Sequence, residues 1–126
     1  YVKNIGHGQQ KRDFVYIKDV VDLMYYLWVS YKNTHNSLHS GIYNVGTGKA
    51  ETFEDLGQAV FSALDKKPQF EWIEMPENIR SQYQYFTEAD LTNLRSQTNY
   101  QKEFVSLEEG VHDYVRHYLM SERRYL

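Results

Sequence analysis

The chain is organised around residues 6–20, which read Gly6-His-Gly-Gln-Gln-Lys-Arg-Asp-Phe-Val-Tyr-Ile-Lys-Asp-Val20. A glycine turn, an alternating run and a helix start follow one another here. In an extended segment successive side chains point to opposite faces, so Arg12, Phe14 and Tyr16 share one face. An arginine fork beside aromatic rings can hold a diphosphate at two points, which predicts a nucleotide-linked ligand. The alternative is a surface arginine paired with Asp13.

Composition indicates one compact domain and excludes several functions. The 126 residues are 41% hydrophobic and 16% aromatic, which is enough for a single core. A net charge of -3 argues against a nucleic-acid partner. The absence of cysteine excludes disulfides, thiolate metal sites and a cysteine nucleophile. Because no stretch has the length of a membrane span or the pattern of a signal peptide, we expect a cytoplasmic protein with no membrane partner.

Hydrophobic periodicity predicts alternating strands and helices, and therefore an α/β fold. Thr52 with Asp55, and Ser106 with Glu109, have the spacing of capping boxes that begin helices. The expected elements are, in order, an extended segment at 12–17, a helix from Asp19 to about Lys32, a strand at 42–45, a helix from Thr52 to about Lys66, a strand at 70–75, a short helix at 87–94 and a helix from Ser106.

Apolar side chains cover nearly the whole circumference of the first of these helices. Val20, Met24 and Trp28 share one face, and residues such as Val21 and Tyr25 fill much of the rest. A helix that is apolar all round is normally buried on more than one side. We therefore expect this helix to need more neighbours than the chain itself offers.

The turn around Gly46 and Gly48 invites comparison with phosphate-binding loops, but its spacing fails. A P-loop would need glycine in place of Tyr43 and serine or threonine in place of Ala50. A dinucleotide fingerprint that starts at Gly46 would need glycine in place of Glu51. We therefore interpret the segment as a tight turn between a strand and a helix.

The histidines form no metal-binding pattern. Two of them lie in a polar loop without carboxylates, and His112 and His117 are five residues apart, on different sides of their helix. We expect no metal site. His7 precedes Arg12 in the glycine turn, where it either faces a ligand or is a solvated turn residue.

Three landmarks of this sequence resemble those of extended short-chain dehydrogenase/reductases that act on nucleotide sugars. Residues 6–20 and the Gly-Ile-Tyr-Asn-Val-Gly-Thr-Gly segment at 41–48 are similar to the superfamily in general. The Tyr-Gln-Tyr-Phe-Thr-Glu-Ala-Asp-Leu-Thr-Asn-Leu-Arg segment at 83–95 is most similar to the ADP-glyceromanno-heptose 6-epimerases. The landmarks occur in family order and span nearly the whole chain.

The resemblance implies that residues 1–126 are a single C-terminal fragment of such an enzyme, with the end of the Rossmann-like sheet and the smaller substrate-binding domain. Family members hold their catalytic base in a Tyr-x-x-x-Lys pair, and no tyrosine here has lysine four residues later. No strand-linked glycine fingerprint is present either. The catalytic residues and the NADP site would therefore belong to a missing N-terminal part, and this fragment alone is expected to be inactive.

The implied reaction of the whole enzyme converts ADP-D-glycero-D-manno-heptose to ADP-L-glycero-D-manno-heptose, a precursor of the lipopolysaccharide core. It inverts C6 by transient oxidation with tightly held NADP and return of the hydride to the opposite face. The implied partner is the ADP-heptose substrate, and the full-length enzyme is expected to be a homo-oligomer. Three alternatives remain open: the same region of another nucleotide-sugar epimerase or dehydratase, a non-catalytic remnant that binds sugar nucleotides, and a degenerate reading frame.

The resemblance also implies which residues bind substrate. Arg12 matches the arginine that contacts the substrate diphosphate, and Tyr83 matches a tyrosine that contacts substrate in the heptose branch. Arg80 is a candidate second phosphate ligand, although related enzymes place an arginine at a slightly different spacing. The turn before Arg12 would line the nucleotide-sugar pocket more weakly, through Asn4, Ile5, Gly6 and His7. Many relatives have an aromatic residue where Ile5 stands, so base stacking is in doubt there.

Overall fold

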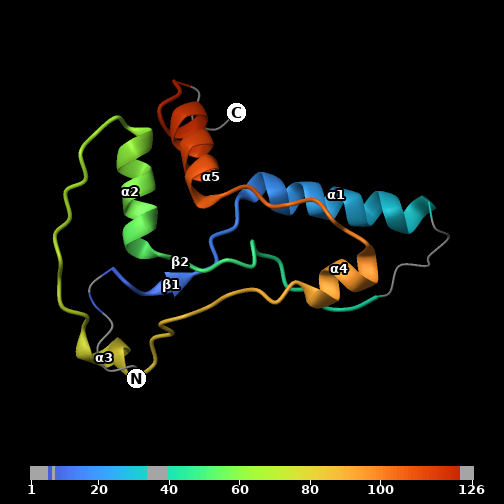
Figure 1. The fold of residues 1–126 in the computed structure, drawn as a ribbon, viewed down its shortest axis with the longest axis horizontal. Coiled ribbons are helices and arrows are strands. Elements are labelled where there is room, and N and C mark those ends of the chain that lie inside the picture. The colour runs from blue at the N-terminus through green and yellow to red at the C-terminus, as the bar shows by residue number, and fades with distance from the viewer. Residues whose placement is uncertain (1–5, 7, 34–39, 123–126) are drawn as a thin grey trace.

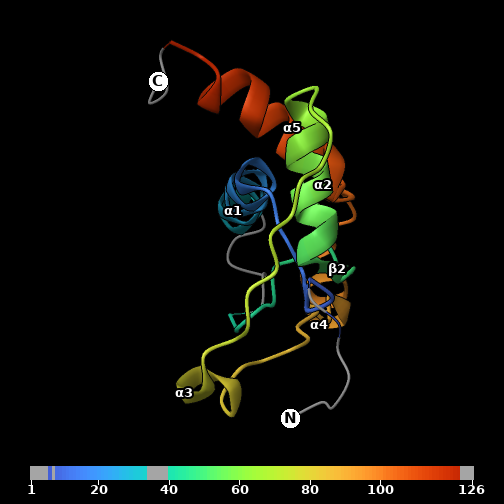
Figure 2. The same cartoon turned by 90° about the vertical axis from the view of Figure 1, so that its left-hand side faces the viewer.

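A computed structural model describes residue 6, residues 8–33 and residues 40–122 of this chain (Figure 1). Its elements are β1 (Lys11–Arg12), α1 (Ile17–Asn33), β2 (Glu51–Thr52), α2 (Phe53–Ala63), α3 (Glu77–Arg80), α4 (Thr92–Thr98), α5 (Leu107–Tyr114) and a π-helical turn η1 (Val115–Leu119). Helices α2 and α5 lie side by side in both ribbon views, while α1 crosses the molecule above α4 (Figures 1 and 2). The described residues mix helix with a small two-stranded sheet.

Helix α1 packs on α4 through a small aromatic core. Leu23 of α1 and Leu94 of α4 are fully buried, together with Tyr100 just beyond α4. The ring of Tyr26 meets Tyr100 edge-on at 5.1 Å between centroids, and the Tyr26 hydroxyl donates to the Thr98 carbonyl at 2.9 Å. One face of α1 is therefore held by α4 and the segment that follows α4.

Helix α1 begins two residues earlier than Asp19, the residue from which the sequence predicts it to start. Asp19 lies in the first turn of the helix and is buried. Its carboxylate accepts a hydrogen bond from the backbone N–H of Val105 at 2.9 Å. A carboxylate near a helix N-terminus is favourable in either position, but this one also joins α1 to the segment that leads into α5.

Helices α2 and α5 form the second packed layer, and both begin with the capping boxes that the sequence predicts. Thr52 accepts from the Asp55 N–H at 2.9 Å and Ser106 accepts from the Glu109 N–H at 3.2 Å, with the reciprocal bonds also present. Helix α2 packs on α5, and two of its small residues, Ala59 and Ala63, are buried. Both predicted helix starts are confirmed.

Asp113 of α5 ties this layer to the start of α1. Its carboxylate accepts from the Tyr16 hydroxyl and pairs with Lys18 Nζ at 2.6 Å. Burial of Tyr16, and secondly its bond to Asp113, raise the pKa of the Tyr16 hydroxyl to about 12. The hydroxyl is therefore protonated at neutral pH and serves as a donor.

The strands predicted at 42–45 and 70–75 do not form in the structure. Ile42 is 93% exposed, and residues 64–76 run as an extended connection from α2 to α3 along the outside of the molecule (Figure 1). Phe70 packs edge-on against Phe61 of α2, with centroids 5.7 Å apart. Alternating side chains suit both segments to a sheet, but a strand also needs a neighbour that pairs with its backbone. The described residues supply no such neighbour.

The short helix predicted at 87–94 lies further along the chain, because α4 begins at Thr92. Leu91 is the N-cap and has no side-chain capping bond, while Asp90 just before it accepts a hydrogen bond from the Thr92 N–H at 2.9 Å in a local turn. Phe86, just before the predicted helix, instead forms a parallel β-bridge with Lys11. Long-range pairing thus overrides the local helix signal. No helix in the described part of the chain has the length and apolarity needed to cross a bilayer.

Candidate substrate-binding site

Three chain segments meet at β1. Lys11 and Arg12 pair antiparallel with Thr52 and Glu51 of β2. On the other side of β1, the Lys11 N–H donates to the Tyr85 carbonyl at 2.8 Å, and the Lys11 carbonyl accepts from Thr87 at 3.2 Å. The glycine-turn segment, the start of α2 and the segment after α3 are therefore held together at one place.

Arg12 lies at this meeting point between two aromatic rings. Its guanidinium carbon is 5.2 Å from the ring centroid of Tyr83 and 5.9 Å from that of Phe53. The guanidinium donates to the Lys11 carbonyl at 2.7 Å and to the Gln84 carbonyl. A guanidinium has five N–H donors, so two bonds to carbonyls leave donors for an anion. The site can therefore offer a fixed, charged fork to a ligand.

The structure contradicts the interpretation of Arg12 as a surface arginine paired with Asp13. The Asp13 carboxylate turns toward the other face of the extended segment and binds backbone N–H groups there. Arg12 instead makes its hydrogen bonds to backbone carbonyls. Among the described residues, no carboxylate is therefore hydrogen-bonded to the Arg12 guanidinium.

Tyr83 and Arg80 come from the segment around α3 but have different surroundings. Tyr83 stacks edge-on with Tyr85 at 5.2 Å and lies over Arg12. The Arg80 guanidinium binds locally, to the Met75 carbonyl at 2.9 Å and to Glu74 at 3.5 Å. The structure thus brings Tyr83 to Arg12, whereas the hydrogen bond and ion pair of Arg80 hold it to its own loop.

Gly6 is exposed, and its carbonyl accepts from the Gln9 N–H at 3.2 Å, which makes the turn before β1. The other turn residues expected to line the pocket, Asn4, Ile5 and His7, lie outside the described residues. Gly8 has a positive φ of 72°, and a Cβ there would come within 2.5 Å of the Trp72 ring. The positive φ favours glycine at this position, and any larger residue would also displace the Trp72 ring.

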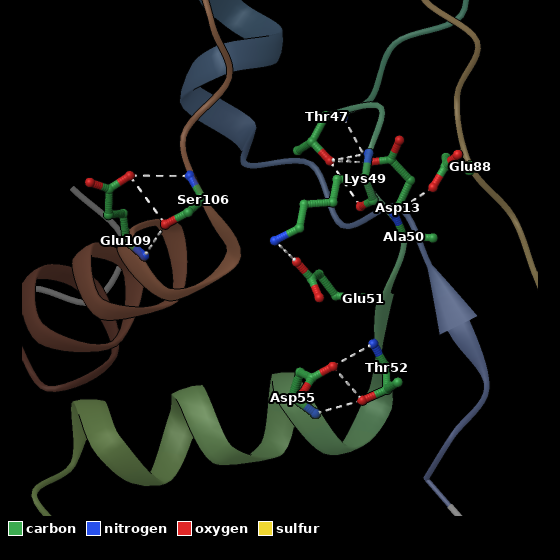
Figure 3. Close-up of polar contacts among 10 residues, drawn as sticks. All are labelled: Asp13, Thr47, Lys49, Ala50, Glu51, Thr52, Asp55, Glu88, Ser106 and Glu109. Carbon is green, nitrogen blue, oxygen red and sulfur yellow. Dashed lines mark hydrogen bonds and ion pairs between the residues drawn. The ribbon is translucent and has the colours of Figure 1, made fainter.

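The carboxylate of Asp13 binds the turn around Gly46 and Gly48, and Figure 3 shows it beside Thr47 of that turn. Its carboxylate accepts from the backbone N–H groups of Thr47 at 2.7 Å, Gly48 at 2.9 Å and Ala89 at 3.0 Å. It also accepts from the Thr47 hydroxyl at 2.7 Å. Partial burial opposes ionisation of Asp13, but the hydrogen bonds from Thr47, Ala89 and Gly48 outweigh it and lower the pKa of the carboxyl.

This arrangement does not fit a cofactor phosphate. In a phosphate loop the backbone N–H groups face an anion of the ligand. Here the Asp13 carboxylate already occupies them, and a Cβ at Gly46 would lie 2.5 Å from its Oδ2. The glycine turn is therefore structural rather than a phosphate loop, as the sequence predicts, although the strand predicted before it does not form.

Two features of the site were missed by reasoning from sequence: the ring of Phe53 beside Arg12 and the role of Asp13. Phe53 directly follows the capping residue Thr52, so its placement at the sheet was open to prediction once β1 and β2 were known to pair. Among the described residues, no group of three potential metal ligands is present. The ring of His117 contacts Asp113 at 2.8 Å, one helical turn away.

Comparisons with known proteins show what this chain is similar to. Residues 2–46 match the model of the NAD dependent epimerase/dehydratase family. The whole chain is 50% identical to an ADP-L-glycero-D-manno-heptose-6-epimerase of Fusobacterium nucleatum, and 94% of it is 45% identical to one of Nitratidesulfovibrio vulgaris. The chain is therefore similar in sequence to part of these epimerases. It spans 38% and 35% of the length of these two relatives, and corresponds to their C-terminal part.

Solved structures show the same fold at low sequence identity. A UDP-N-acetylglucosamine 4-epimerase from Methanobrevibacter ruminantium aligns over 87% of this chain with a TM-score of 0.65 and 21% identity. RMD from Pseudomonas aeruginosa, solved with NADPH, aligns over 86% with a TM-score of 0.61 and 16% identity. Each match uses 32% of the neighbour's chain, so the fold is one portion of an extended short-chain dehydrogenase/reductase.

Proposed function

We propose that this chain is the substrate-binding part of an NADP-dependent ADP-L-glycero-D-manno-heptose-6-epimerase, an isomerase. The observation that carries the proposal is the Arg12 guanidinium, which lies 5.2 Å from the Tyr83 ring and is hydrogen-bonded to no carboxylate of the described residues, in a chain 50% identical to an enzyme of that name. Arg12 would bind the diphosphate through its free N–H donors, and Tyr83 would bind the sugar nucleotide beside it.

The remaining substrate contacts are proposed from the resemblance. The turn of Asn4, Ile5, Gly6 and His7 would line the pocket, and Arg80 would have to leave its ion pair with Glu74 to reach a phosphate. No catalytic residue is assigned to this chain. NADP supplies the hydride chemistry when it is bound, and we assign its binding to the part of the relatives that this chain does not match.

We further propose that this cofactor-binding part packs on the outer face of α1. Ile17, Val21, Met24 and Trp28 recur at helical spacing along that face, and each is more than half exposed. A contiguous apolar stripe of this kind marks a contact surface.

The proposed function predicts that the 126-residue chain alone neither epimerises ADP-heptose nor binds NADP tightly. Joining it to the unmatched part of the Fusobacterium nucleatum relative should give a chimera that does both, because the groups for substrate and cofactor are then combined. Epimerisation is measured by separating the two ADP-heptose epimers and quantifying the product. Cofactor binding is measured by fluorescence titration with NADPH.

Activity of the chain alone would overturn its assignment as a substrate-binding part. A chimera that binds NADPH and epimerises UDP-N-acetylglucosamine but not ADP-heptose would overturn the substrate assignment and leave the fold assignment intact. The native Fusobacterium nucleatum relative serves as the positive control for both assays.

A second prediction concerns the exposed face of α1. The isolated chain should be loosely packed or self-associated at micromolar concentration, because the stripe has no partner within the described residues. Trp28→Glu should shift it toward monomer in sedimentation velocity, whereas Gln97→Glu, a control on the exposed surface of α4, should not. A parent chain that is a monodisperse monomer with a sharp cooperative melt would contradict the prediction.

A further inference from the structure

The strongest unassigned feature of the site is the ring of Phe53. Arg12 lies between this ring and that of Tyr83, with its guanidinium carbon within 6 Å of both centroids, at 5.9 and 5.2 Å. Phe53 is 40% exposed, so burial of the ring in a core accounts for only part of its placement. We propose that Phe53 is a positioning residue, which holds the Arg12 guanidinium for the diphosphate of the substrate. This inference rests on the proposed function.

The start of α2 places the ring rigidly. The Phe53 backbone N–H donates to the Gln10 carbonyl at 3.1 Å, directly beside β1. Thr52, the residue before it, pairs with Lys11 in the sheet and caps α2. On its other side, Phe53 meets the ring of Phe14 edge-on at 5.5 Å. Backbone and ring are therefore both fixed relative to the strand that carries Arg12.

An aromatic ring suits this position because of how it holds a cation. The face of the ring attracts the guanidinium without accepting strong hydrogen bonds from its N–H groups. Those N–H groups therefore stay available for the phosphate oxygens of a ligand. A carboxylate in the same place would attract Arg12 more strongly but would compete with the substrate diphosphate for it. Carbonyls of Lys11 and Gln84 bind one part of the guanidinium, and the two rings limit its remaining freedom.

Phe53→Leu keeps an apolar side chain of similar size and removes the ring. In the chimeric epimerase described above it should weaken binding of ADP, used as the diphosphate probe, by about two- to five-fold, the range expected for an exposed cation–π contact. The loss should fall on KM for ADP-heptose rather than on kcat, and Phe53→Tyr, which retains the ring, should restore the affinity. Calorimetric titration with ADP and steady-state kinetics measure these effects.

A double-mutant cycle separates this role from a structural one. If the ring acts through Arg12, Phe53→Leu should cause no further loss of ADP affinity in an Arg12→Ala background. Phe61→Leu is the matched control, because Phe61 is an aromatic residue of the same helix that packs on Phe70. It should leave ADP affinity unchanged. If circular dichroism shows that Phe53→Leu does not fold, Phe53→Met replaces it in the same comparison.

The possible failures are distinguishable. Unchanged ADP affinity in Phe53→Leu, with Arg12→Ala still weakened, would overturn the positioning role and leave the proposed function standing. If Phe53→Leu lowers ADP affinity equally in the parent and in the Arg12→Ala background, the ring acts on the fold and not through Arg12. That result would also overturn the positioning role. Unchanged affinity in Arg12→Ala would overturn the diphosphate site itself, and the role of Phe53 with it.

Discussion

Arg12→Ala in the chimeric epimerase is expected to weaken ADP-heptose binding by about 10- to 150-fold and to leave NADP binding unchanged. A hydrogen bond to a charged group contributes about 1.5 to 3 kcal/mol net, which corresponds to that range. Substrate titration of each variant measures the effect. Tyr83→Phe removes a neutral hydrogen bond and should cost about 10-fold at most. Arg12→Lys should recover only part of the affinity, because lysine keeps the charge and loses the fork.

Arg95 provides a matched control for Arg12. Its guanidinium also binds two backbone carbonyls, those of Tyr100 at 2.8 Å and Lys102 at 2.7 Å, and it also lies over an aromatic ring, 5.6 Å from Tyr100. Arg95→Ala should therefore lower stability without changing substrate affinity. If Arg12→Ala binds ADP-heptose as tightly as the parent, or if both variants lose affinity equally, the assignment of the diphosphate site is wrong.

Asp13→Ala is expected to lower the free energy of unfolding by about 2 to 4 kcal/mol, because it removes one charged acceptor from several donors at once. Those donors are the backbone N–H groups of Thr47, Gly48 and Ala89 and the Thr47 hydroxyl. Urea unfolding at fixed protein concentration measures the loss of stability. Amide hydrogen exchange should accelerate most, relative to the parent, at the backbone N–H groups of these three residues.

The same carboxylate predicts a dependence of stability on pH. The folded state lowers the pKa of Asp13, so its contribution is fully present above the unfolded value of about 3.9 and is lost as the pH falls through the folded value. Asp13→Asn should therefore be less stable than the parent at pH 7, and the difference should shrink in acid. Asp90→Asn is the control, since Asp90 is exposed and its carboxylate accepts hydrogen bonds from one residue, Thr92, rather than from the three residues that donate to Asp13. Equal losses from the two variants would contradict the proposed role of the turn.

The sequence by itself determined the features that depend on near neighbours along the chain. Both capping boxes are confirmed because a capping box joins residues only three apart, such as Thr52 and Asp55. The apolar circumference of α1 was likewise visible from helical spacing, but which of its apolar side chains stay exposed was decided by packing. The family was also predictable, since the motifs that carry the resemblance are contiguous runs of sequence.

Only the tertiary structure decided the features that join distant segments. Asp13 reaches Thr47 and Ala89, which are 34 and 76 residues further along the chain, and these contacts stand in place of the alternative pairing with Arg12. The strands predicted at 42–45 and 70–75 are absent because a strand is completed by a partner's backbone, which an alternating pattern does not supply. The approach of Tyr83 and Phe53 to Arg12 follows from the same cause: pairing of β1 with its two neighbours sets those distances, and no local propensity encodes them.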